Sequence, residues 1–284
     1  MTIFREDGSL DSEANRAHAD FLIGQGVHGL HVLGAVGEFM HMNLKEREQH
    51  ATEMCQHVDG RVPVVIETGT TSTRETMRLS RHAQGVGASA VSIITPYFWS
   101  LSEREVIAHY SAVANAVDLP IIVNNAPGNT GVSVATETLA ALAREHRNLA
   151  GVTDAIDSLE HLRQRVSAMK AVNPEFRVLS GLDVHIVSIM EMGGDGIIPA
   201  TANVAPEQYV DLYNAWNRRD LEGAHERLAR FMPAMDMLRV PGSLLSIITE
   251  AMTMRGVVNA GAPRQPALPL SAESRARLRD TLAR

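Results

Sequence analysis

The fold is decided by one short apolar stretch, Asn148-Leu149-Ala150-Gly151-Val152-Thr153-Asp154. Its small and β-branched residues predict a buried β-strand that ends in a polar pair, Thr153 and Asp154. Similar runs recur and alternate with amphipathic helical patterns, about thirty residues per unit. They are apolar without alternation, which is typical of parallel strands covered on both faces. The runs lie at residues 29–33, 62–66, 90–94, 120–123, 149–153, 177–179 and 196–200.

Repeated strand–helix units predict an α/β fold, either a (β/α)8 barrel or a doubly wound sheet. Two of the intervening helices begin with a capping box, formed by Asn43 with Glu46 and by Ser102 with Glu105. A barrel needs an eighth strand, and the short run Thr2-Ile3-Phe4 is the one candidate for it.

Four helical patterns follow the last predicted strand. They lie at residues 207–217, 221–237, 244–256 and, after a proline-rich linker, 271–282. We interpret residues 1–205 as the barrel, with a short or truncated first strand. Residues 206–284 then supply the last barrel helix and a C-terminal helical region packed on the barrel.

Composition narrows the class of protein. The chain has 284 residues, a formal net charge of −7 and a single cysteine, Cys55. The acidic balance disfavours a nucleic-acid or anionic-membrane partner. No apolar run reaches the roughly 18 residues of a membrane span, and no signal-peptide pattern precedes the first elements. We therefore expect a cytoplasmic protein without an internal disulfide.

The histidines do not form a metal-binding pattern. The chain has 12 of them, but no His-x-x-x-His pair and no Cys–His cluster. His50 and His57 lie on one face of a helix that we expect to point outward. We therefore predict no metal and no cofactor.

Five motifs, each just past a predicted strand, resemble those of one enzyme family. They are Gly34-Ala35-Val36-Gly37-Glu38, Thr95-Pro96-Tyr97-Phe98, Asn124-Asn125-Ala126-Pro127-Gly128-Asn129-Thr130, Ser180-Gly181-Leu182-Asp183, and Gly193-Gly194-Asp195-Gly196 with Thr201-Ala202-Asn203-Val204. Over nearly the whole chain, the sequence resembles the dihydrodipicolinate synthase / N-acetylneuraminate lyase family. The resemblance implies a (β/α)8 TIM barrel with additional C-terminal helices, assembled as a homotetramer of paired dimers. It also implies an active site at the C-terminal ends of the strands.

Several positions that bind substrate in that family carry other residues here. Ala35 and Val36 stand where the family has a hydroxyl pair that holds the keto-acid carboxylate. Phe98 stands where it has a tyrosine that completes a proton relay across a subunit interface. Asn129 stands where it has an arginine that binds a carboxylated second substrate. The resemblance thus implies weak or absent pyruvate binding.

The residues of the chemical step differ as well. Asn124 stands where the family has the tyrosine that protonates and orients the intermediate, and Thr153 stands where it has the Schiff-base lysine. A threonine hydroxyl cannot form an imine with a keto acid. The chain has two lysines, Lys45 and Lys170, and we expect both on solvated outer helices. A Schiff-base lysine must be neutral, which requires desolvation or a neighbouring cation.

Other candidate site residues also follow predicted strands. Glu67, where the family has glycine, is a candidate general acid or base among apolar neighbours, or a carboxylate that pairs with nearby N–H groups. Tyr97 could bind ligand or shape the wall of the site. Asp154 and Asp183 match acids of the family framework, for which a structural role competes with substrate binding. Ile198 is a further candidate for substrate contact.

These residues are compatible with two functions. The first is a lyase or hydratase-type enzyme acting on a small keto or hydroxy acid without a Schiff base. The second is a non-catalytic binding or regulatory member that holds a small carboxylate or sugar-acid ligand. The intact scaffold with its ring of polar residues favours the first, and the simultaneous loss of lysine, tyrosines and hydroxyls favours the second.

Overall fold

The computed structural model describes residues 1–283, apart from the side chains at positions 233 and 234. The chain divides into two compact units, one formed by Met1–Val62 with Ala200–Arg284 and the other by Pro63–Pro199. The predicted division after residue 205 remains a prediction. Residue 284, the end of the predicted helical region, lies outside the described residues.

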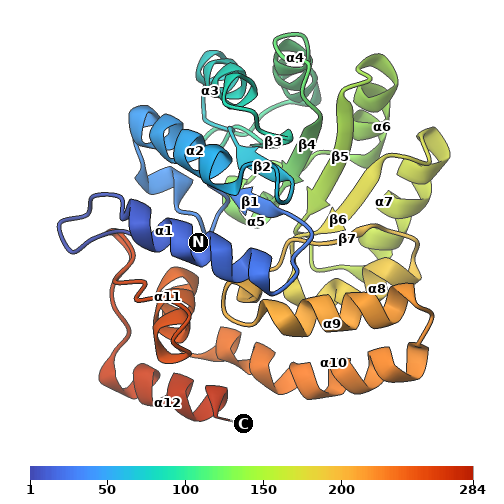
Figure 1. Cartoon of the computed structure of the whole chain (residues 1–284). Helices are drawn as coiled ribbons and strands as arrows, with labels where there is room; N and C mark the ends of the chain where they lie inside the picture. Colours follow the sequence, from blue (N-terminus) through green and yellow to red (C-terminus); the bar gives the residue numbers. More distant parts are fainter. Residues whose placement is uncertain (284) are drawn as a thin grey trace. The chain divides into compact units, whose positions relative to one another are not determined.

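Parallel strands form the centre of the unit Pro63–Pro199 (Figure 1). They are β2 (Val64–Glu67), β3 (Ala90–Ile94), β4 (Ile121–Asn125), β5 (Leu149–Asp154), β6 (Arg177–Ser180) and β7 (Gly196–Ile197). Each pairs in parallel with the next, and strand order in the sheet follows chain order. All five residues of β3 are buried, which confirms the prediction of strands covered on both faces.

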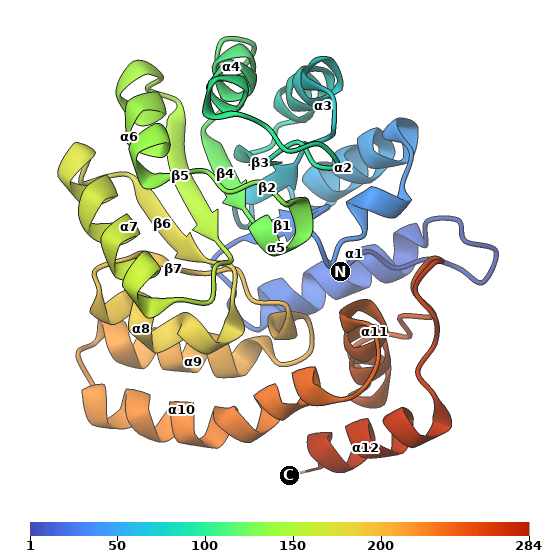
Figure 2. The same cartoon turned by 180° about the vertical axis from the view of Figure 1, so that it is seen from behind.

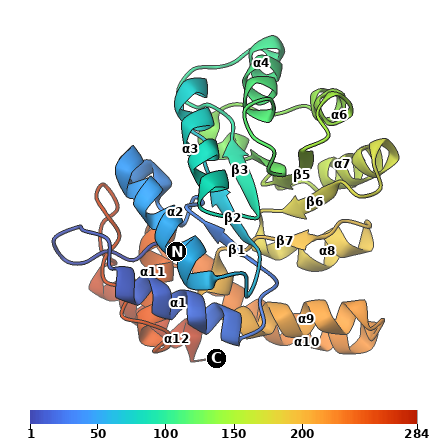
Figure 3. The same ribbon diagram turned by 45° about the horizontal axis from the view of Figure 1, so that its top comes forward.

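Helices lie along the outer side of these strands, as Figure 3 shows for α3, α4, α6 and α7. The helices of this unit are α3 (Thr73–Gly85), α4 (Glu103–Ala114), α5 (Pro127–Thr130), α6 (Thr136–Glu145), α7 (Leu159–Val172) and α8 (Ile186–Glu191), with the 3-10 turn η2 (Asp183–His185). The predicted capping box of Ser102 and Glu105 is present at the start of α4. Helix α4 is tied inward by Tyr110, whose buried hydroxyl donates to the Ile93 carbonyl at 3.0 Å.

Contact between α3 and α4 makes the fold sensitive to acid. His109 of α4 is buried and its Nδ1 lies 2.9 Å from the Thr73 hydroxyl of α3. Burial lowers the pKa of His109 to about 4. In the unfolded chain this imidazole binds a proton near its ordinary pKa of about 6.5. Between these two values the unfolded state holds more protons, so stability is lost as pH falls through that window.

We therefore expect the free energy of unfolding to fall between pH 6.5 and pH 4, with His109 contributing about 1.4 kcal/mol per pH unit. The variant His109→Gln should show a shallower slope in denaturant melts across this range. The exposed His225, on α10, offers a control, and its replacement by Gln should leave the slope unchanged. Equal slopes in the protein and the His109 variant would contradict this expectation.

The other unit is mainly helical. It contains α1 (Ser12–Gly24), β1 (Leu30–Val32), η1 (Phe39–His41), α2 (Leu44–Val58), η3 (Thr201–Asn203), α9 (Pro206–Asn217), α10 (Leu221–Met235), η4 (Asp236–Arg239), α11 (Leu244–Met254) and α12 (Ala272–Leu282). The capping box of Asn43 and Glu46 at the start of α2 is confirmed. The four helical patterns predicted after the last strand are also confirmed, and α9 and α10 run side by side (Figure 2).

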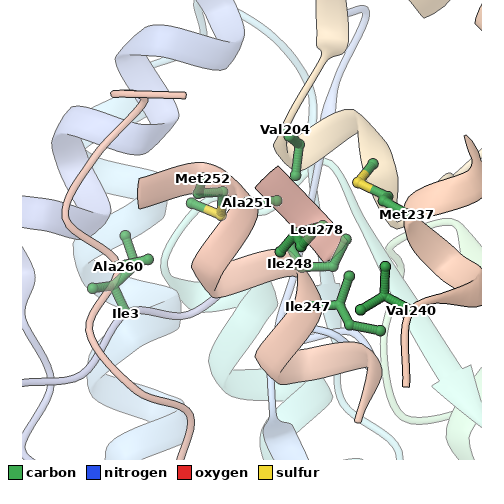
Figure 4. Close-up of a cluster of buried hydrophobic side chains, with 10 residues drawn as sticks. All are labelled: Ile3, Val204, Met237, Val240, Ile247, Ile248, Ala251, Met252, Ala260 and Leu278. Carbon is green, nitrogen blue, oxygen red and sulfur yellow. The ribbon is translucent and has the colours of Figure 1, made fainter. Parts of the chain in front are cut away.

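A hydrophobic cluster joins the C-terminal helices of this unit (Figure 4). Its buried members come from both ends of the chain and are Ile3, Val204, Met237, Val240, Ile247, Ile248, Ala251, Met252, Ala260 and Leu278. Since burying one such side chain contributes roughly 1.5–3 kcal/mol, this cluster stabilises the arrangement of α11 and α12.

The predicted eighth strand is wrong, because Thr2-Ile3-Phe4 forms only an isolated antiparallel bridge between Phe4 and Leu10. The backbone N–H and carbonyl of Ile3 form hydrogen bonds with a side chain instead of with a neighbouring strand. Asn15 accepts from the Ile3 N–H at 2.9 Å and donates to the Ile3 carbonyl at 2.8 Å. Seven strands are therefore present in the described chain.

Arg264 connects three segments of the same unit. Its guanidinium donates to the Gly8 carbonyl at 2.9 Å and to the His41 carbonyl at 2.9 Å, and it pairs with Glu46 of the capping box. It also lies 4.2 Å from the centre of the Phe4 ring. The Arg264 backbone N–H donates to the buried carboxylate of Glu38 at 3.0 Å. The linker before α12 is thereby fastened to the N-terminal segment and to the start of α2.

Candidate functional site

Neighbouring strand ends bring three predicted site residues together. Glu67 ends β2, Asn124 lies near the end of β4, and Thr153 lies near the end of β5. Asn124 and Thr153 are register partners, so their side chains stand on the same face of adjacent strands. Ser92 of β3 is the register partner of Glu67, and its strand lies between those of Glu67 and Asn124. A row of four polar side chains thus crosses β2 to β5.

Four donors surround the Glu67 carboxylate, which is fully buried. Its Oε1 accepts from the backbone N–H groups of Gly69 at 3.1 Å and Ile94 at 2.9 Å. Its Oε2 accepts from the Ser92 hydroxyl at 2.9 Å and the Asn124 amide at 3.0 Å. Gly69 permits the tight turn, because a Cβ there would lie 2.7 Å from Ile94. Four hydrogen bonds use the acceptor capacity of an ionised carboxylate.

Thr153 differs from its neighbours because its hydroxyl is unpartnered. The residue is only 5% exposed, and its Oγ1 makes no hydrogen bond with the described part of the chain. Its methyl lies towards the end of β6, since a Cβ on Gly181 would be 3.3 Å from Thr153 Cγ2. A buried hydroxyl without a partner costs about 1–3 kcal/mol, so this group is a candidate for ligand contact.

Asp154 points to the opposite face of β5, because successive side chains of a strand alternate. Its Oδ2 lies 2.8 Å from His161 Nε2 and 3.2 Å from Arg165 Nε, both on α7. The same oxygen accepts from Asn125 of β4 at 3.2 Å. Burial lowers the pKa of the Arg165 guanidinium, and the Asp154 charge opposes that effect. This carboxylate therefore fastens α7 and β4 to the end of β5.

The remaining predicted residues lie at several places. Tyr97 is half-buried after β3, Asn129 is exposed in α5, Asp183 is buried in η2, and Ile198 is half-buried after β7. The Ile198 N–H donates to the Ser180 carbonyl at 2.9 Å, which extends the β6–β7 pairing. Ala35 and Val36 belong to the other unit, where Ala35 is exposed and Val36 half-buried.

The two lysines lie elsewhere. Lys170, near the end of α7, donates to the Phe176 carbonyl at 2.9 Å and to the Asp195 carboxylate at 2.8 Å. These partners precede β6 and β7, so Lys170 lies at the strand ends opposite to Thr153. Burial opposes ionisation of Asp195, but hydrogen bonds from Lys170 and Val178 outweigh it and lower the Asp195 pKa. Lys45 is exposed on α2 in the other unit.

Among the described residues, no group of three or more His, Cys, Asp or Glu side chains could hold a metal ion. No helix in residues 1–283 is long and apolar enough to cross a membrane.

Sequence reasoning missed Ser92 and overlooked the partners of Asp154. A signal for Ser92 existed, since it is the one polar residue in the apolar run Ala90-Val91-Ser92-Ile93-Ile94. Its position two residues before the strand end gives it the facing direction of Ile94. The partners of Asp154 lie on another element, so their contact depends on helix packing that the sequence does not reveal.

Comparison with known proteins identifies the family. The model of the dihydrodipicolinate synthetase family matches residues 1–284. YjhH of Escherichia coli K12, provisionally named a 2-dehydro-3-deoxy-D-pentonate aldolase, is 42% identical over 257 residues, covering 89% of this chain and 84% of YjhH. YagE of the same strain, provisionally named a 2-dehydro-3-deoxy-D-gluconate aldolase, is 39% identical over 284 residues, covering 99% of this chain and 93% of YagE.

Solved structures agree with this assignment. The crystal structure of E. coli YagE in complex with pyruvate matches with a TM-score of 0.96 at 38% identity, over 99% of this chain and 95% of that one. A monomeric dihydrodipicolinate synthase variant matches with a TM-score of 0.94 at 33% identity, over 100% of this chain and 93% of that one. The fold is the α/β TIM barrel of these proteins with C-terminal helices, and the chain belongs to the dihydrodipicolinate synthetase family.

Proposed function

We propose that this chain is a lyase that acts on a small keto or hydroxy acid without forming a Schiff base. It would cleave a carbon–carbon bond or remove water. The observation that carries the proposal is the buried, unpartnered hydroxyl of Thr153. This residue lies near the end of β5, beside Asn124 of β4. A hydroxyl forms hydrogen bonds, but only an amine condenses with a keto group to an imine.

The relatives support a small acid as the substrate. YjhH and YagE carry names of aldolases for 2-dehydro-3-deoxy sugar acids, and YagE has been crystallised in complex with pyruvate. On this proposal Thr153 occupies the lysine position of the family. The positions of Lys45 and Lys170 support this, since one is exposed on α2 and the other is held by Asp195.

The proposed chemistry is electrostatic. The Thr153 hydroxyl would donate to the substrate oxygen on which negative charge develops as the neighbouring bond breaks. A positioned donor of this kind contributes on the order of 100- to 1,000-fold in rate. The rest of the ligand would contact residues that follow the same strand ends, namely Tyr97, Asn129, Asp183 and Ile198. Ala35 and Val36 also remain candidates for ligand contact.

A second candidate is a non-catalytic member that binds a small carboxylate or sugar acid. The observation that favours it is the Glu67 carboxylate, whose two oxygens already accept four hydrogen bonds. A base must have a free lone pair for the proton that it removes. Glu67 therefore serves better to hold Asn124 than to take a proton from substrate.

Turnover assays separate the two candidates. We would incubate the protein with 2-dehydro-3-deoxy-D-gluconate, 2-dehydro-3-deoxy-D-pentonate and the matching aldonates, and follow pyruvate release and dehydration. A lyase should lose about 100-fold or more of its rate in Thr153→Val and keep most of it in Thr153→Ser. The Val variant should melt at an equal or higher temperature, because a methyl replaces an unpartnered hydroxyl.

The outcomes differ clearly for the two candidates. No turnover of any of these acids, together with a ligand-dependent rise in melting temperature, would favour the binding protein. Turnover that persists unchanged in Thr153→Val would contradict the proposed role of this hydroxyl.

We also propose that the protein is a cytoplasmic homotetramer built from paired dimers. Its support is the resemblance of the Phe98 loop to the family's interface loop. Phe98 and Trp99 are 85% and 75% exposed and meet edge to face, with ring centres 5.7 Å apart. Two adjacent aromatic rings in water are typical of an interaction surface.

A substitution tests this assembly. Phe98→Asp should split the tetramer into smaller species in sedimentation velocity, because it places a charge in a buried contact. The matched control is Leu268→Asp, at a residue that is 68% exposed on the other unit and that should leave assembly intact. A tetramer that survives Phe98→Asp would contradict the proposed interface.

A further inference from the structure

The orientation of the Asn124 amide is set by Glu67. The Glu67 carboxylate accepts from four groups, and an ionised carboxylate has no hydrogen to donate. The end of Asn124 that lies 3.0 Å from Glu67 Oε2 must therefore be its NH2 group. Its carbonyl oxygen then points away from Glu67.

That carbonyl oxygen is available to a ligand. Asn124 is 9% exposed, and among the described residues the one hydrogen bond of its side chain is the bond to Glu67. In the next strand, its register partner Thr153 has the unpartnered Oγ1. The site therefore offers an acceptor on Asn124 beside a hydroxyl on Thr153.

We propose that Asn124 and Thr153 together recognise a hydroxyl group of the ligand, so that the site prefers a 2-hydroxy acid over the corresponding 2-keto acid. This inference rests on the proposed function of the same site. A ligand hydroxyl donates to Asn124 Oδ1 and accepts from the Thr153 hydroxyl. A keto oxygen only accepts, and placing it against Asn124 Oδ1 brings two acceptors together and leaves one of them unpaired.

Glu67 is then a positioning residue for specificity. In Glu67→Gln, the carbonyl oxygen of the new amide can still accept the hydrogen bonds from the backbone N–H groups of Gly69 and Ile94. The NH2 of the new amide then faces Ser92 and Asn124. Two NH2 groups cannot bond to each other, so the Asn124 amide turns over and presents its own NH2 to the ligand. The Asn124 side chain then presents a hydrogen-bond donor to the ligand instead of an acceptor. The variant should therefore bind the keto acid more tightly than the hydroxy acid.

The matched control is Ser92→Ala. The Ser92 hydroxyl donates to the same Glu67 oxygen at 2.9 Å and is equally buried, but it does not set the direction of the Asn124 amide. Removing the Ser92 hydroxyl takes away one hydrogen bond to Glu67, but the carboxylate still faces the Asn124 amide. The Ala variant should therefore keep the order of preference of the unmodified protein.

Isothermal titration calorimetry with D-gluconate and 2-dehydro-D-gluconate tests the proposal, since these acids differ only at C2. We expect the unmodified protein to bind gluconate about tenfold tighter or more. The order should reverse in Glu67→Gln and persist in Ser92→Ala. Thermal melts of each variant establish that it is folded.

Three results would overturn the inference. Tighter binding of the keto acid by the unmodified protein overturns this inference alone and leaves the lyase proposal standing. Equal losses for both acids in Glu67→Gln would make Glu67 a structural residue without a part in specificity. Binding of neither acid by the unmodified protein overturns the inference together with the proposed function.

Discussion

In the double variant Thr153→Lys/Glu67→Gly, we expect borohydride to trap a pyruvate adduct that does not form in Thr153→Lys alone. The lysine would stand at the end of β5, one strand from Asn124, which lies 3.0 Å from the Glu67 carboxylate. The long lysine side chain would extend along the same polar row towards Glu67, and a carboxylate within about 4–6 Å holds an ammonium group in its charged form. Imine formation needs the neutral amine, so the carboxylate must be removed as well.

Intact mass after reduction is the measurement for both variants, with borohydride alone as the blank. The single variant Glu67→Gly serves as the control without an added amine and should give no adduct. An adduct of equal yield in Thr153→Lys with Glu67 retained would contradict the expectation that the Glu67 carboxylate keeps the added amine charged. With pyruvate in large excess, so that weak binding does not limit the reaction, absence of an adduct in a folded double variant would contradict the placement of Thr153 at the lysine position.

The largest effect on stability is expected from Arg264→Ala. The side chain is 16% exposed and pairs with Glu46, which is 26% exposed. Its removal leaves the Gly8 and His41 carbonyls without their donor and removes the contact with the Phe4 ring. Truncating one member of a largely buried pair costs about 3 kcal/mol.

Thermal melts measure this effect, and we expect a fall of roughly 6–12 °C in Tm for a loss of that size. Arg275→Ala is the matched control, because Arg275 pairs with Glu250 at 2.7 Å but is 54% exposed. An exposed pair contributes about 0–1 kcal/mol, so the control should melt close to the unmodified protein. Equal melting temperatures for the two variants would refute the role given to Arg264.

Local signals explain how much of the fold could be predicted from the sequence. The apolar strands and both capping boxes depend on residues within a few positions of one another, so the sequence predicts them correctly. The prediction of an eighth strand is wrong because the conformation of Thr2-Ile3-Phe4 depends on Asn15. The Asn15 side chain forms hydrogen bonds with the N–H and carbonyl of Ile3, and no local sequence pattern indicates that contact.

The site was predictable in its position more than in its chemistry. The sequence predicts that Glu67, Asn124 and Thr153 lie at strand ends, and the structure brings these ends together. The sequence could not show that Glu67 accepts four hydrogen bonds, because two of the donors are backbone groups made available by the turn at Gly69. Nor could it show which face of β5 Asp154 occupies, since that depends on strand register.

Whether this protein forms an imine is tested most directly by borohydride trapping of the unmodified protein with pyruvate, read by intact mass beside a family enzyme that has the Schiff-base lysine. We expect a clear adduct in the control enzyme and none in this protein. We also expect calorimetry to find weak or no pyruvate binding. A stable adduct on Lys45 or Lys170, or a low-micromolar Kd for pyruvate, would contradict the proposed absence of imine chemistry.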